Sequence, residues 1–211
     1  MNAGPSTLNV MADFTVPTLF RGATMSIVKS CVAAALCICL TIGKSTAGPQ
    51  SQEMRIDAAS SKMTVNVGRS GLFGFAGHDH EVIAPVLEGT VMLDRTNLSR
   101  SRLSIQFDAT AMKITGKGEP AKDVPEVQRV MLSERVLDVQ RHPKITFVSE
   151  SISVAQQSPN HVQLRINGRL TLRGVTHPVT VPTQVELTAN RLTATGRATV
   201  KQTRLILVFV R

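Results

Sequence analysis

Apolar and polar residues alternate along most of the chain after residue 60. In the stretch KMTVNV, Met63, Val65 and Val67 fall on one side, and Thr64 and Asn66 fall on the other. The same period of two recurs in LEGTVMLD, RLSIQFDA, PKITFVSE, HVQLRING, RLTLRG, HPVTVP, TQVELTA and RLTATGRATVK. Turn-forming stretches such as DRTN, SPN and AN separate these segments. This pattern is typical of an antiparallel sandwich or barrel, so it predicts an all-β fold.

One segment departs from this period. Asp123 stands where a helix N-cap is expected, and Pro125 falls in the first turn that follows. Val127 and Val130 then follow at helical spacing. These features predict a single helix from Pro125 to Val136, placed as a lid or packed beside the sheet. We expect one domain, because no internal repeat is evident and nothing divides the alternating part into two cores.

A different pattern, over residues 25–47, precedes the alternating part. It has a basic start at Lys29, an apolar run from Cys31 to Ile42, and small residues up to Ala47. The run is shorter than the ~20 residues that span a membrane as a helix. The pattern therefore predicts a secretory signal peptide that is cut after Ala47. A retained membrane anchor is the alternative.

The expected signal peptide sets the expected domain boundaries. We expect Met25 to be the initiator and residues 1–24, in which we find no periodic pattern, to be a gene-model extension. The mature barrel domain is then residues 48–211, located in the periplasm or secreted, with no stable membrane span.

Composition excludes several classes of function. The three cysteines, Cys31, Cys37 and Cys39, all lie in the expected signal peptide, so the mature chain has no thiol for disulfides, catalysis or metal binding. The net charge of +9 is dispersed along the sequence, which favours a role in solubility. The chain has no Trp and no Tyr to stack on bases, so we expect no nucleic-acid partner.

Three longer stretches carry a family resemblance. They are IDAASSKMTVNV, MLSERVLDVQRHPKITFVSESI and NGRLTLRGVTHPVTVPTQVEL. From residue 56 to about 203 the sequence resembles the YceI-like family of secreted lipid- and polyisoprenoid-binding proteins. The resemblance implies a lipocalin-like antiparallel barrel of about eight strands. It also implies a binding protein, not an enzyme, whose lumen holds a polyisoprenoid, an isoprenoid quinone or a fatty lipid without a cofactor.

The inward faces of the expected strands are aliphatic and often small. Small inward residues would leave an apolar space that accepts an apolar chain in preference to water. The alternative is a core in which these positions only make room for other side chains. The candidate ligand-binding residues of lumen and mouth are Leu72, Phe73, Phe75, Leu87, Val91, Leu93, Leu103, Ile105, Phe107, Ile145, Phe147, Leu170, Leu172, Ala194 and Ala198.

The sequence departs from the family after Thr203. Family members continue there with Asp-Phe-Gly and closing strands, whereas this chain reads RLILVFVR. We therefore expect a truncated or frameshifted C-terminus, missing closing strands and a barrel with open edges that invite association. In the alternative, the apolar tail supplies one substitute strand that partly buries itself in the lumen.

The stretch GHDHEV holds the candidate metal ligands. On a strand His78 and His80 project to the same side, a spacing that zinc and copper sites use. A metal-binding protein or metal-dependent enzyme centred on this pair is therefore the alternative function. We favour a polar turn at the mouth of the barrel, beside an apolar rim formed by Leu72, Phe73 and Phe75.

Arg165, Arg169 and Arg173 are spaced four residues apart. They could form a phosphate-binding row. On a strand, however, their even spacing places all three on the polar face, so we expect a solvated outer face of the barrel.

Overall fold

The structure is a computed structural model that describes residues 7–17, 51–67, 79–188 and 191–201. The described residues form strands and a few short helical segments. The strands are β1 (Thr7–Pro17), β2 (Ser51–Arg55), β3 (Lys62–Val67), β4 (His80–Asp94), β5 (Arg102–Asp108), β6 (Lys113–Ile114), β7 (Lys144–Gln157), β8 (His161–Leu172), β9 (Val175–Leu187) and β10 (Arg191–Lys201). The helical segments are η1 (Ala58–Ser60), η3 (Leu98–Arg100) and α1 (Val124–Leu132).

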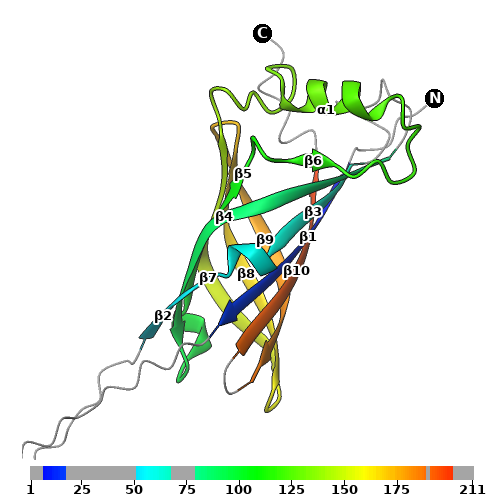
Figure 1. The fold of residues 1–211 in the computed structure, drawn as a ribbon. Coiled ribbons are helices and arrows are strands. Elements are labelled where there is room, and N and C mark those ends of the chain that lie inside the picture. Colours follow the sequence, from blue (N-terminus) through cyan, green and yellow to red (C-terminus); the bar gives the residue numbers. More distant parts are fainter. Residues whose placement is uncertain (1–6, 18–50, 68–78, 189–190, 202–211) are drawn as a thin grey trace, which may run out of the picture.

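The long strands form a closed antiparallel ring (Figure 1). Its order is β4-β3-β1-β10-β9-β8-β7-β5, and β5 pairs back onto β4. The short strands β2 and β6 also pair with β4, because this strand of 15 residues extends past both of its main neighbours. The prediction of an all-β, lipocalin-like fold with one short helix is confirmed.

The closing position between β3 and β10 is occupied by β1. This strand pairs with β10 from Thr7↔Lys201 to Pro17↔Arg191, and with β3 from Leu8↔Val67 to Asp13↔Lys62. The sequence predicts no element in residues 1–24, and it predicts missing closing strands and open edges. In the described structure, residues 7–17 form a strand instead. Their sequence, TLNVMADFTVP, alternates apolar and mostly polar residues, a pattern that suits a barrel strand.

A bulge in β4 changes which residues of this strand face the interior. Relative to β5, the strand carries one extra residue after Val86, namely Leu87. Ala84 and Val86 are buried before the bulge, and Gly89 and Leu93 are buried after it, so the buried phase shifts by one residue. Leu87 was expected to face the lumen, but it lies on the outside with 45% of its surface exposed.

Helix α1 lies across one end of the barrel (Figure 1). Its buried residues Val127, Val130 and Met131 form the face that packs on the core. Gln128 attaches the helix to the segment before it: its amide nitrogen donates to the Met112 carbonyl at 2.8 Å, and its amide oxygen accepts from the Ile114 nitrogen at 2.9 Å. The helix is therefore a cover over the end of the barrel, one of the two placements that the sequence analysis considered.

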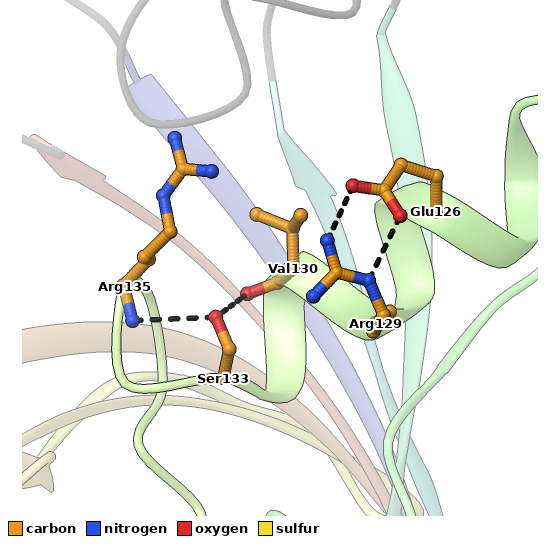
Figure 2. Close-up of polar contacts among 5 residues, drawn as sticks. All are labelled: Glu126, Arg129, Val130, Ser133 and Arg135. Carbon is orange, nitrogen blue, oxygen red and sulfur yellow. Dashed lines mark hydrogen bonds and ion pairs between the residues drawn. The ribbon is translucent and has the colours of Figure 1, made fainter.

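The cover helix ends four residues before the predicted boundary at Val136. Ser133 adopts an extended conformation, and its hydroxyl donates to the Val130 carbonyl at 2.7 Å (Figure 2). The same hydroxyl accepts from the Arg135 nitrogen at 3.3 Å, which fixes the turn that follows. On the exposed side, Arg129 contacts Glu126 through two hydrogen bonds of 2.6 and 2.8 Å. These bonds lower the pKa of Glu126.

Candidate functional site

The barrel encloses an apolar cavity of about 250 Å³. Side chains of β3, β4, β5, β7, β8, β9 and β10 line it, together with residues of the covering segment. Met131 and Val136 line it at the end covered by α1. Leu98 and Ser101 line it beside the start of β5, which is the end of that strand away from α1. The cavity therefore follows the barrel from one end to the other.

Small residues contribute to this cavity in two ways. A methyl group at Gly168 would lie 2.6 Å from the Phe147 ring, and one at Gly196 would lie 2.8 Å from Val181. These glycines therefore make room for neighbouring side chains, as the packed-core alternative expected. Gly196 also lines the cavity, together with Ala194 and Ala198 of the same strand, whose small size leaves volume open. Close packing against neighbouring side chains and open volume therefore occur in the same lining.

Most of the residues selected from the sequence for the lumen line this cavity. They are Val91, Leu93, Leu103, Ile105, Phe107, Ile145, Phe147, Leu170, Leu172, Ala194 and Ala198. Leu87 lies outside the barrel because of the bulge in β4. The expected rim residues Leu72, Phe73 and Phe75 lie outside the described residues. Whether the lining residues bind a ligand stays a prediction.

The part of the lining that comes from the covering segment is not predicted by the sequence. Met112, Met131, Val136 and Leu137 all line the cavity, and all lie in the segment between β5 and β7. Their own spacing carried no signal for this role. Strand alternation identifies inward positions, but it says nothing of which irregular segment folds over the barrel end.

Polar groups on the described lining of the cavity are few. They are Ser101, Arg102, Arg173 and Thr183, and no Asp or Glu is among them. Arg102 is exposed, and its guanidinium donates to the carbonyls of Arg100 and Ser101 at 3.2 and 2.9 Å. The described lining thus carries positive charge and no negative charge.

Arg173 differs from the other two arginines of its predicted row. Arg165 and Arg169 are exposed on β8, as expected, and Arg169 lies 3.7 Å from Glu150. Arg173 follows the end of β8 and adopts a left-handed backbone, with φ of 51°, before Gly174 with φ of 73°. The expectation of a solvated outer face is therefore wrong for Arg173, which is partly buried and belongs to the cavity lining. Its guanidinium donates to the carbonyl of Val136 in the cover at 3.2 Å.

The candidate metal ligands are divided by the boundary of the described residues. His78 lies outside them, whereas His80 begins β4 and is fully buried. Its Nδ1 lies 3.0 Å from a carboxylate oxygen of Glu119, whose side chain is only 1% exposed. Among the described residues, no three His, Cys, Asp or Glu side chains come together in a way that could hold a metal ion. The metal hypothesis, which needs His78, stays a prediction.

The His80–Glu119 pair links the barrel wall to the segment that leads into α1. The neighbouring Glu81 strengthens this link, because its carboxylate contacts the Thr115 hydroxyl at 3.2 Å and the Lys117 ammonium at 3.5 Å. Glu119 was not identified from the sequence, since it is far from the GHDHEV stretch and no motif joins the two.

Two aspartates fix the turns at the ends of β4 and β5. Asp94 accepts from the Thr96 hydroxyl at 2.6 Å and from the nitrogens of Thr96 and Asn97 at 2.9 Å each. Asp108 accepts in the same way from Thr110. These hydrogen bonds stabilise the ionised carboxylates and lower the pKa of both groups.

No helix within the described ranges is long and apolar enough to cross a membrane.

Comparison with known proteins gives a family and a similar solved structure. The model of the YceI-like domain matches residues 54–206, which is more than half of the chain. The crystal structure of Burkholderia cenocepacia BcnA is similar at 17% identity and a TM-score of 0.35, over 56% of this chain and 94% of that one. No curated protein matches the chain.

Proposed function

Because the chain belongs to the YceI-like family, we propose that it is a binding protein that holds the apolar tail of a lipid or isoprenoid in its lumen. One observation carries the proposal: the apolar cavity follows the barrel from the α1 end to the η3 end. A cavity lined this way excludes water and accepts hydrocarbon.

The size of the cavity limits the ligand. At roughly 30 Å³ per water-sized group, the 250 Å³ holds about eight carbons of an extended chain. A longer polyisoprenoid, quinone or fatty tail requires side chains to move aside. The lining includes Met63, Met112 and Met131, whose unbranched side chains adapt to irregular shapes. These methionines would let the lumen expand around a longer chain.

We further propose that the protein acts in the periplasm or is secreted. The basic start, short apolar run and small residues of 25–47 support this location. Cleavage after Ala47 would also remove β1 from the chain. The edges of β3 and β10 would then lose the partner that they have in the described structure.

The proposal is tested by extracting the purified full chain with organic solvent and analysing the extract by mass spectrometry. We expect a long-chain amphiphile to be recovered. Ala194→Phe should lower the recovered amount, because Ala194 lines the cavity and a ring there fills it. Val148→Phe is the matched control, since Val148 is 49% exposed on the outside. Recovery of no lipid from the wild-type chain would refute the proposal.

A further inference from the structure

The charged side chains of the described cavity lining are two arginines. Arg102 begins β5, and Arg173 follows β8 in the turn beneath the covering segment. The two arginines therefore lie near opposite ends of one apolar cavity, and the Arg173 guanidinium contacts the carbonyl of Val136, another lining residue. Such an arrangement suits a ligand that has a hydrocarbon tail and a negatively charged head group.

The two arginines differ in environment. Arg102 is exposed, so water screens its charge, and its guanidinium is engaged by two carbonyls of its own turn. Arg173 is partly buried between the apolar lining and the cover. A charge–charge interaction is stronger where less water surrounds it. An anionic head group therefore gains more by binding at Arg173.

The backbone at Arg173 is unusual for this residue. Two-residue hairpin turns with positive φ at both positions favour Asn, Asp or Gly at the first position. This turn carries Arg there, at a φ of 51°. A non-glycine residue in the left-handed region points to a function when the side chain it positions meets a candidate site. Here that residue belongs to the cavity lining.

A second polar group lies on the lumen side of the same hairpin. His177 of β9 pairs in register with Leu170, which lines the cavity, and paired residues share a face of the sheet. Its Nε2 is buried and has no hydrogen-bond partner among the described residues. An imidazole nitrogen in this position can bond to an oxygen of a head group.

We propose that the cavity ligand is an acidic amphiphile whose carboxylate or phosphate binds Arg173 at the α1 end while its tail extends toward Arg102. This inference rests on the proposed function and narrows it to a class of ligand. A guanidinium forms paired, charge-assisted hydrogen bonds with the two oxygens of either group.

The test compares three probes of equal chain length in the lipid-free full chain: decanoate, decyl phosphate and decanol. We expect one or both acids to bind about tenfold or more tightly than the alcohol. The stronger acid identifies the head group as carboxylate or phosphate. Arg173→Gln removes the charge and keeps an amide donor on a shorter side chain. It should remove the preference, so that the acids bind about as tightly as decanol does in the same variant.

Two further variants control the interpretation. Arg173→Lys should retain the preference for acids in part, and Arg102→Gln should retain it in full. Equal affinity for acids and alcohol in the wild-type chain would overturn the inference, although the proposed function would stand. Loss of the preference in Arg102→Gln instead of Arg173→Gln would also overturn it. If no probe binds and no lipid is extracted, the proposed function itself fails.

Discussion

Two sides of the barrel are built in different ways. The hairpin side consists of β7, β8 and β9, in which each strand pairs with the next one in the chain over long registers. The closure side consists of β3, β1 and β10, in which β1 brings Thr7 beside Lys201. Antiparallel strands joined by short turns close small loops, whereas pairing of distant segments orders much more chain. The hairpin side is therefore specified locally, and the closure side depends on the whole chain.

The largest expected effect comes from removing β1. A chain of residues 48–211 loses the pairing of β1 with both β3 and β10. Each backbone hydrogen bond contributes about 0.5–1.5 kcal/mol, so the loss is comparable with a domain's total stability of about 5–15 kcal/mol. We expect this chain to associate through its free edges, so that each edge pairs with another copy.

The measurement compares the full chain with residues 48–211 by size-exclusion chromatography with light scattering. A monomeric 48–211 chain would show that another segment closes the barrel. That result would agree with the substitute strand considered for the C-terminal tail.

The two sides also differ in how well the sequence predicts them. Alternation in HVQLRING and HPVTVP, with a Gly-containing turn between them, is sufficient to predict the hairpin of β8 and β9. For the closure side, TLNVMADFTVP carries a comparable alternation, yet its distance from β3 and β10 gives no pairing signal. Its position before an apolar segment that resembles a signal peptide further directed the prediction away from a strand.

The candidate site also contains residues that the sequence predicts correctly and residues that it does not. Strand positions such as Ile105 and Phe147 were found from period-two alternation, because that period determines which side chains face inward. The prediction for Leu87 was wrong because a bulge shifts the alternation of inward and outward residues by one, and a bulge leaves no clear mark in this sequence. The prediction of an outward Arg173 was wrong because β8 ends one residue before it, so strand alternation does not apply there. Each error follows from a local break in regular geometry.

A second prediction compares one glycine from each side. A methyl group at Gly168 would lie 2.5 Å from the Val148 carbonyl oxygen, and the backbone there is held by the β7–β8 ladder. Gly168→Ala should lower the free energy of unfolding by about 2–3 kcal/mol, as overpacked cores do. At Gly196 the nearest atom belongs to the Val181 side chain, at 2.8 Å.

The Val181 side chain can rotate away, so Gly196→Ala should lower the free energy of unfolding by less, about 1 kcal/mol. Both free energies are measured by urea unfolding under lipid-free conditions, with Ser153→Ala on the exposed surface as the control. Equal costs at the two glycines would show that the hairpin side is no more rigid than the strand next to β1.

The smallest expected effect concerns Asp94. It lies at the end of β4, beside the turn that leads to β5, and neither strand belongs to the hairpin side or the closure side. Hydrogen bonds from Thr96 lower its pKa in the folded protein. The carboxylate therefore stabilises the fold fully above its unfolded pKa of about 3.9, and this contribution disappears as the pH falls through the lower folded value. Asp94→Asn should be less stable than the wild type at neutral pH, and the stabilities of the two proteins should converge in acid.

Thr96→Val removes the hydroxyl donor, so the Asp94→Asn substitution should lower the stability less in that background than in the wild type. Urea unfolding at several pH values measures both effects, and a gap that persists unchanged into acid would show that the ionised carboxylate does not stabilise this turn.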